Sequence, residues 1–204
     1  MPPLFSTAYF PPIAYVAAIF RHTEALIETK ETFPKQTYRN RMMIMTAGGV
    51  RALTVPVIRN NHSRTEEVTI DYKERWSIIH LRTLTAAYNA SPYFMYYKDG
   101  IERLLMAPYH HLIDLNTACT EWILRQLKIN CTLDYTTDFI PFSADNPLDF
   151  RHLFSPKHPY PADNHKPYYQ VFNDRIPFTP NLSILDLLFN LGPEARDYLE
   201  HMKP

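Results

Sequence analysis

The sequence predicts one α/β domain, built on a mainly parallel sheet with flanking helices, one β-hairpin and an irregular C-terminal arm. Three observations predict this class. The chain opens with a strand–turn–helix pattern, short apolar strands and amphipathic helices follow it, and 46% of the 204 residues are hydrophobic. This length and apolar content suffice for one domain with a substantial core, and they exclude an intrinsically disordered chain.

The opening unit begins with residues 3–9, which alternate loosely between apolar and polar side chains and stop at the Phe-Pro-Pro sequence 10–12. Proline is tolerated in the first turn of a helix, so residues 13–20 are predicted to form a buried helix. The short apolar run 25–29 gives a second strand. Many nucleotide- or substrate-binding α/β domains begin in this way.

A hairpin and a helical region are predicted next. The extended runs 42–46 and 50–58 are joined by Ala47-Gly48-Gly49, whose glycine pair supplies the positive φ of a hairpin turn. Apolar residues at helical spacing then predict three amphipathic helices, over residues 75–90, 93–106 and 110–129. Residues 132–138 read as a late strand.

The segment 139–180 differs from the rest of the chain because it holds eight of the 18 prolines, interleaved with aromatic residues. Proline disfavours regular helices, so we expect an ordered irregular arm wrapped over the core; the alternative is a mobile tail with a few docked aromatics. We therefore expect a single domain over 1–204, with an α/β core at 1–138, the arm at 139–180 and two short C-terminal helices at 181–204. Asn181 or Ser183 would cap the first of these helices.

The charge balance limits the classes of ligand. Lys plus Arg and Asp plus Glu both total 21, so the formal net charge is zero. Without an extended basic face the chain is not expected to bind nucleic acid, and any anion site must be a local cluster. The neutral balance also predicts modest solubility, or self-association as a homo-oligomer.

Missing sequence motifs exclude further classes of protein and of binding site. Cys119 and Cys131 form no zinc-binding pair. The apolar N-terminal stretch is interrupted by two proline pairs and lacks a basic leader, so we predict no signal peptide, no membrane span and a cytoplasmic protein. The four glycines form neither a GxGxxG fingerprint nor a P-loop, and the sequence therefore identifies no cofactor.

A cation cluster lies between residues 35 and 41. Its members are Lys35, Gln36, Tyr38, Arg39, Asn40 and Arg41. Three cations with amide and phenol donors offer the charge-assisted hydrogen bonds that a phosphate or carboxylate needs, so these residues are candidates to bind a small anionic molecule. The alternative is a solvated surface turn that pairs with Glu28 or Glu31.

His80 lies one turn after Trp76 on a predicted helix and is a candidate acid or base, although a hydrogen-bonded core histidine is the alternative. A metal site is not predicted. The residues that could gather one, at spacings that match no standard site, are His152, His158, Asp163 and His165.

Asp186 and Asn190 are four positions apart and share one helix face among Leu and Phe residues. A carboxylate there is either on the exposed stripe of an amphipathic helix or buried and paired with a cation. We favour a buried acid, with Arg39 or Arg41 as its partner.

Several segments, taken in order, resemble the WbqC-like protein family. They are STAYFPPIAY, KQTYRNR, LTVPV, AYNASPYF, LIDLN and PNLSILDLLFNLGPE, and they span from about Ser6 to Leu199. The family takes its name from O-antigen gene clusters, so the resemblance implies a role in surface-polysaccharide biosynthesis. Family members open with a His-Gln-Pro stretch where this chain has Phe5-Ser6-Thr7-Ala8, so no catalytic residue is carried over.

The family's opening also resembles nucleotidyltransferase-type Rossmann-like domains. This resemblance implies a Rossmann-like parallel sheet with a site at the strand carboxyl ends, around residues 8–12. It adds Tyr9 and Pro11 to the candidate binding residues.

Two functions follow as alternatives. The first is a transferase-type enzyme acting on a nucleotide-linked or amino sugar, in which residues 35–41, Tyr9, Pro11 and Asn190 hold a phosphate or carboxylate and His80 or Asp186 is the acid or base. The second is a non-catalytic ligand-binding or scaffold protein of the same pathway, with the arm as a partner surface.

Overall fold

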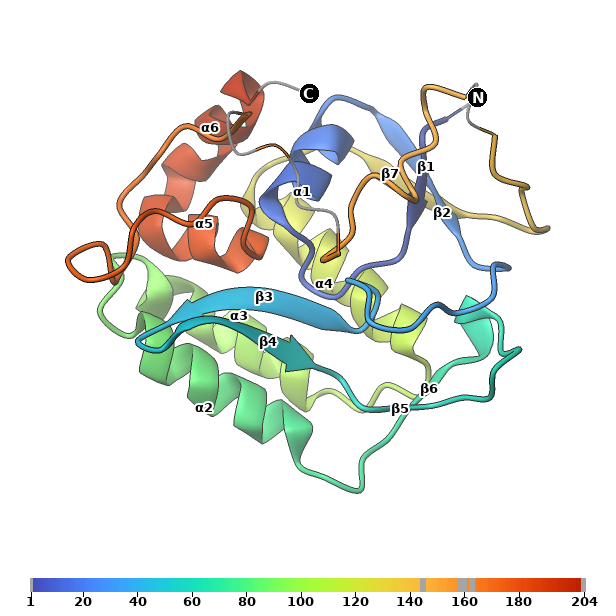
Figure 1. Cartoon of the computed structure of the whole chain (residues 1–204), viewed down its shortest axis with the longest axis horizontal. Helices are drawn as coiled ribbons and strands as arrows, with labels where there is room; N and C mark the ends of the chain where they lie inside the picture. The colour runs from blue at the N-terminus through green and yellow to red at the C-terminus, as the bar shows by residue number, and fades with distance from the viewer. Residues whose placement is uncertain (1, 144–145, 158–160, 162–163, 203–204) are drawn as a thin grey trace.

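A computed structural model describes residues 2–143, 146–157, 161 and 164–202. The α/β class is confirmed. Its centre is a parallel sheet of three strands, β1 (Leu4–Ser6), β2 (Glu24–Glu28) and β7 (Thr132–Tyr135), with β2 in the middle (Figure 1). All three strands point the same way, so their carboxyl ends lie along one edge of the sheet.

The first crossover is the predicted strand–turn–helix unit. Helix α1 (Ile13–Phe20) begins directly after Pro12, whose missing N–H is not needed at a helix start. Six of its eight residues are buried, because the sheet lies on one side of α1 and the C-terminal helices pack on the other. The predicted bounds of this helix are confirmed.

The predicted hairpin is confirmed as β3 (Arg41–Thr46) and β4 (Gly49–Thr54), with Gly49 at φ 97°. The second run predicted for the hairpin is interrupted, and only Val57–Ile58 (β5) continues it, paired with Thr69–Ile70 (β6). Pro56 accounts for the break, because proline offers no N–H to a strand ladder.

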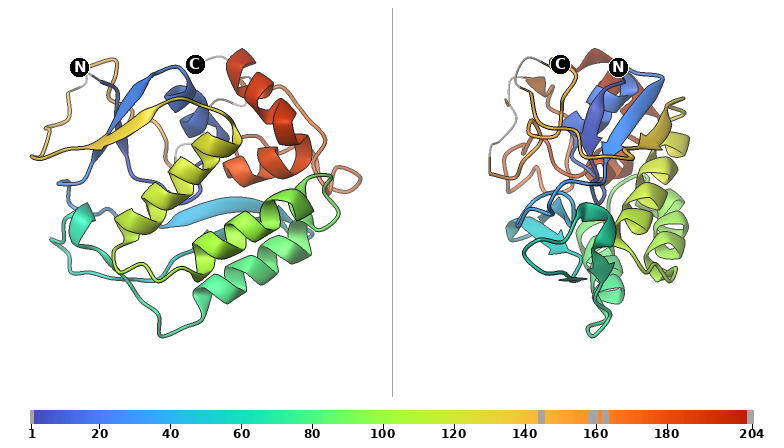
Figure 2. Two further views of the ribbon diagram at one scale, coloured as in Figure 1. Left: turned by 180° about the vertical axis from the view of Figure 1, so that it is seen from behind. Right: turned by 90° about the vertical axis from the view of Figure 1, so that its right-hand side faces the viewer.

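Three helices occupy the middle of the chain. They are α2 (Trp76–Tyr88), α3 (Phe94–Met106) and α4 (Leu112–Gln126), as the three amphipathic patterns predict. Figure 2 shows α4 running beside the sheet, with α3 and α2 beyond it. The short 3-10 turn η1 (Thr65–Glu67) contacts α4. None of the described helices is both long and apolar enough to cross a membrane.

The C-terminal region packs on α1 and α3. Helix α5 (Ile184–Leu191) is followed by the turn η3 (Gly192–Glu194) and by α6 (Ala195–His201). Ser183 caps α5, since its Oγ accepts a hydrogen bond from the Leu185 N–H at 3.4 Å. Of the two capping residues proposed from the sequence, Ser183 is therefore the N-cap.

The arm is irregular, as predicted, and in its described parts no α-helix or β-strand occurs. It is nonetheless anchored to the sheet. Leu4 donates its N–H to Leu148 O and accepts from the N–H of Phe150, both at 2.8 Å. The Phe150 ring stacks on Phe5 with centroids 4.9 Å apart. This part of the arm is an ordered covering of the β1 edge.

Candidate functional site

A cavity of about 600 Å³ opens at the carboxyl ends of β2 and β7, beside the N-terminal half of α4. Open α/β sheets usually bind their ligands at this edge. We call this hollow the strand-end cavity. Its lining residues are Thr29, Lys30, Glu66, Ile113, Asp114, Thr117, Ala118, Glu121, Tyr135, Thr136 and Thr137.

Hydroxyl groups form much of its wall. The N–H of Thr29 donates to Thr136 Oγ1 at 3.0 Å, and Thr29 Oγ1 donates to Thr136 O at 3.1 Å, which joins the end of β2 to the end of β7. Thr117 Oγ1 on α4 lies 2.6 Å from the OH of Tyr135. A hydroxyl both donates and accepts, so this wall suits a ligand that carries hydroxyl groups itself.

The charged residues of the cavity are mainly acidic. Lys30 Nζ is paired with Glu66 Oε2 at 2.6 Å, and the opposite charges of the two groups cancel. Asp114, in the first turn of α4, and Glu121, two turns later, add two further carboxylates. Glu121 Oε2 lies 3.7 Å from Nη1 of Arg125 in an exposed pair on the same helix, which offsets part of its charge. The excess of negative charge favours a cationic group on the ligand and disfavours an anion.

The pKa of the Tyr135 phenol responds to the same negative charges. Burial raises the pKa of the Tyr135 phenol, and the hydrogen bond with Thr117 lowers it. The negative charges of Glu121, Asp114 and Asp134 raise the pKa further. The phenol therefore stays protonated at neutral pH. Because Thr117 Oγ1 donates its proton to Ile113 O at 2.8 Å, the Tyr135 OH donates to Thr117 Oγ1 and keeps its lone pairs for a ligand donor.

Behind the Thr117–Tyr135 pair lies a small recess of about 10 Å³, close to the volume that one water molecule needs. Asn116 lines it and is 1% exposed. Its Nδ2 donates to Thr7 Oγ1 at 3.1 Å and to Arg39 O at 2.8 Å, whereas its Oδ1 is buried with no partner among the described residues. A buried acceptor of this kind is best satisfied by a donor placed in the recess.

A buried ion-pair network is hydrogen-bonded to Thr136, one of the residues that line the cavity. Glu28, at the end of β2, is fully buried and accepts a hydrogen bond from Thr136 Oγ1 at 2.9 Å. Arg151 of the arm donates to Glu28 Oε2 at 3.3 Å and to Asp149 Oδ2 at 2.5 Å. The arm thus fixes the carboxylate that orients Thr136, one of the cavity's hydroxyls.

The cation cluster predicted at 35–41 does not line this cavity. Lys35 and Gln36 are exposed, and Tyr38 is half-buried. Arg39 is buried and donates from Nε and Nη2 to Glu31 Oε1, at 2.8 and 2.6 Å. Glu31 is one of the two partners that the surface-turn alternative named. Arg39 is buried, however, whereas that alternative expected a solvated turn. Anion binding by this segment stays a prediction.

The rest of this segment is held against the end of β1. Tyr9 donates its N–H to Tyr38 O at 2.9 Å, and Asn40 Nδ2 donates to Val55 O at 3.0 Å. Arg41 is half-buried, and its Nε is buried with no partner among the described residues. Tyr38 therefore lies beside Tyr9, while the Asn40 side chain is engaged with the backbone of Val55, and ligand binding by these residues stays a prediction.

His80 is buried at 3% exposure, and its Nδ1 lies 3.0 Å from the OH of Tyr9. Burial lowers the pKa of His80 to about 4, and a backbone hydrogen bond to Thr54 opposes that shift. Burial also raises the pKa of Tyr9. Both side chains are neutral at pH 7, which suits a hydrogen bond inside the core. Pro11 contributes a carbonyl that accepts from the Ile184 N–H at 2.8 Å.

The pairing predicted for Asp186 is wrong. Asp186 is fully buried, but its partners are neutral: the OH groups of Tyr88 and Tyr168, at 2.9 and 2.5 Å, and Gln170 Nε2, at 2.9 Å. Burial raises its pKa, and the three hydrogen bonds lower it. Asn190 Nδ2 donates to the backbone oxygen of Asp186 at 2.8 Å. Three neutral donors make a cation unnecessary here, and Arg39 is already paired with Glu31.

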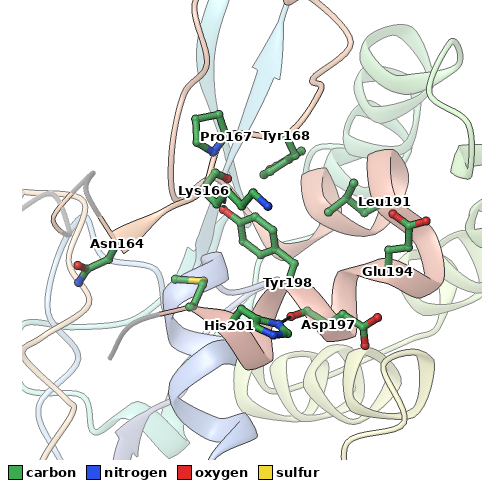
Figure 3. Close-up of a pocket in the computed structure, with 10 residues that line it drawn as sticks. Asn164, Lys166, Pro167, Tyr168, Leu191, Glu194, Asp197, Tyr198 and His201 are labelled. Atoms are coloured by element: carbon green, nitrogen blue, oxygen red, sulfur yellow. Dashed lines mark hydrogen bonds between the residues drawn. The ribbon is translucent and has the colours of Figure 1, made fainter.

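A second hollow, of about 490 Å³, lies between the arm and the C-terminal helices (Figure 3). Figure 3 shows the Tyr198 ring beside Lys166 and Tyr168, with Asp197 and His201 on the same helix. The OH of Tyr198 donates to Lys166 O at 2.7 Å. No described residue of the parallel sheet lines this hollow, whereas the strand-end cavity lies at the carboxyl ends of two strands, where open α/β sheets bind their ligands.

Within the described residues, no three His, Cys, Asp or Glu side chains gather where they could hold a metal ion. His158 and Asp163, two of the four residues considered for such a site, lie outside the described residues.

Sequence reasoning missed the residues of the strand-end cavity. Two signals could have indicated them. Thr136 and Thr137 form a hydroxyl pair directly after the last strand, and Asp114, Thr117 and Glu121 recur at helical spacing on the polar face of α4.

Comparisons with known proteins agree with the resemblance drawn from the motifs. The model of the WbqC-like protein family matches residues 7–152 and 159–198. An uncharacterized protein of Mycobacterium tuberculosis, Rv1507c, is 29% identical over 224 residues, covering 96% of this chain and 93% of its own length. No solved structure matches the chain.

Proposed function

Because this chain belongs to the WbqC-like protein family, we propose that it acts in surface-polysaccharide biosynthesis, as a transferase-type enzyme on an amino sugar that is free or nucleotide-linked. In this proposal the strand-end cavity holds the sugar. The observation that carries it is the composition of the wall, where hydroxyl groups and an excess of carboxylates surround a volume of about 600 Å³.

The chemistry of an amino sugar fits such a wall. Its hydroxyls would exchange hydrogen bonds with Thr137 and Tyr135, which are exposed at the mouth. Its ammonium group would lie against Asp114 and Glu121, and either carboxylate could accept the proton that an amine loses when it becomes a nucleophile. Volumes of this size accommodate a monosaccharide with part of an attached group.

Titration calorimetry tests the binding. D-glucosamine should bind more tightly than glucose, and both more tightly than glucuronic acid, because the cavity carries net negative charge. Replacing both acids (Asp114→Asn with Glu121→Gln) should weaken glucosamine binding about fivefold, or about 1 kcal/mol, and leave glucose unchanged. Glu102→Gln, an exposed acid on α3, is the control. Equal affinity for all three sugars would contradict the proposal.

A non-catalytic ligand-binding protein is the second candidate, and one observation favours it. His80 and Asp186, the acid–base candidates from the sequence, are 3% and 0% exposed and do not line the strand-end cavity. Mass spectrometry separates the two functions. An enzyme should convert a nucleotide-linked amino sugar to an N-acylated product when acyl-coenzyme A is supplied, whereas a binding protein should return the sugar unchanged.

A further inference from the structure

A third hollow, of about 380 Å³, is lined by the start of α3, the C-terminal end of α4 and the joint between η3 and α6. The backbones of these helices come together in Figure 2. We call it the tyrosine pocket. The side chains that define its chemistry are Tyr93, Tyr96, Tyr97, Gln126, Lys128 and Arg196. Two cations and no carboxylate line it, so its charge is opposite to that of the strand-end cavity.

The aromatic wall is held in place on one side and open on the other. Tyr93 packs so closely on Gly192 that a Cβ at that glycine would lie 2.5 Å from the ring. Tyr97 is buried and meets Trp122 edge to face, with centroids 6.0 Å apart. Tyr96 is 77% exposed, although its ring packs edge to face on Tyr97. An exposed ring beside a rigid wall is a surface on which a planar group can stack.

The cationic wall is built from the end of α4. Lys128 has φ 53°, a left-handed conformation that favours glycine, and it closes the helix with the N–H of Ile129 bonded to Leu124 O at 2.8 Å. Glycine at this position would be less strained, yet a lysine occupies it and brings an ammonium group to the pocket. Arg196 is fixed by bonds from Nη1 to the carbonyl oxygens of Leu127 and Lys128.

From this geometry we infer that the tyrosine pocket binds a nucleoside phosphate. The base stacks on Tyr96, and the phosphate oxygens accept hydrogen bonds from Lys128 and from the remaining donors of Arg196. A nucleoside phosphate carries both a flat aromatic group and a dense negative charge, which match the aromatic and the cationic wall of the pocket. The site is separate from the strand-end cavity, and it stands whether or not that cavity binds a sugar.

Calorimetry with uridine diphosphate, uridine and inorganic pyrophosphate tests the inference on the full chain. The diphosphate nucleoside should bind at least tenfold more tightly than either part. Tyr96→Ala should weaken its binding about tenfold. Tyr169→Ala, which removes another ring that is 65% exposed, should leave the affinity unchanged.

Lys128→Gly separates binding from stability. It should raise the melting temperature by about 1–3 °C, because it relieves the left-handed strain, and should weaken uridine diphosphate binding about tenfold. Lys128→Met should weaken binding equally, without the gain in melting temperature. Glucosamine binding should be the same in both variants, so a failure here is distinct from a failure at the strand-end cavity.

The inference is overturned if neither uridine diphosphate nor adenosine diphosphate binds better than pyrophosphate, or if Tyr96→Ala and Lys128→Gly both leave nucleotide affinity intact. Adenosine diphosphate is the second probe, and binding of either nucleotide with the same response to the two variants supports the site.

Discussion

Asp186 shows how a fully buried carboxylate can be stabilised without a cation. Three neutral donors converge on it from α2 and from the arm, through Tyr88, Tyr168 and Gln170. Gln170 is itself bonded to the backbone of Thr179. The acid therefore joins the last third of the arm to helix α5, and its role in this structure is to position that segment.

Replacing this acid should destabilise the fold. In Asp186→Asn the new Nδ2 would face a group that also donates, so we expect the free energy of unfolding to fall by about 2 kcal/mol in urea titrations. Asp174→Asn, an exposed acid of the arm, should change it by less than about 0.5 kcal/mol. Equal stability of the two variants would show that the three hydrogen bonds contribute nothing.

His80 predicts a dependence of stability on pH. Its pKa is about 4 in the fold against an ordinary value of 6.5, so the unfolded chain binds the proton more readily. Stability is therefore complete above pH 6.5 and is lost as the pH falls toward 4, by on the order of 2–3 kcal/mol. Burial lowers the pKa of His165 to about 4 as well, which adds loss in the same window.

Urea unfolding between pH 7.5 and 4.5 measures this loss. His80→Gln removes the group and should flatten the profile by about half, since His165 remains. His201→Gln, an exposed histidine, should leave the profile unchanged. If His80→Gln and the parent chain give parallel profiles, His80 is not neutral and buried as described.

Among the elements, the joint between α5 and α6 depends on one glycine. Gly192 has φ +54°, and any Cβ there would meet the Tyr93 ring. Gly192→Ala should lower the free energy of unfolding by about 2 kcal/mol or more, because it adds both backbone strain and a clash. Gly48→Ala, where the nearest atom would be 3.9 Å away, is the matched control and should be nearly neutral. Thermal denaturation of both variants distinguishes them.

Helices and short strands were predictable because their signals are local. The Pro-Pro pair before α1, the apolar stripe of α4 and the Ser183 cap of α5 each lie within the element that they define. The partners of buried polar groups were not predictable from the sequence, because these partners lie far away along the chain. Asp186 finds Tyr88 98 positions away, and Arg151 finds Glu28 123 positions away.

For the whole molecule, Arg151 is the main polar link between arm and sheet. Arg151→Met would leave Glu28 and Asp149 buried without a cation, so we expect a loss of about 3–5 kcal/mol in the free energy of unfolding. The arm should also become more sensitive to limited proteolysis. Arg175→Met, which removes an exposed pair, should alter neither property.

The location of the candidate site was predictable only in general terms. A parallel sheet places ligands at its carboxyl ends, and the strand-end cavity lies there. The residues that line it were not found from the sequence, because the density of charge at 35–41 indicated an anion site. The fold instead pairs Arg39 with Glu31 and gathers threonines and acids around the cavity.

Chemical-shift mapping of the labelled chain during titration with D-glucosamine tests the central claim, that the strand-end cavity is where the ligand binds. The amide signals of Lys30, Thr117, Thr136 and Thr137 should move together with one saturation curve, while those of Tyr96 and Lys128 stay fixed. Shifts confined to residues outside the cavity, or no saturable shift at all, would contradict the claim.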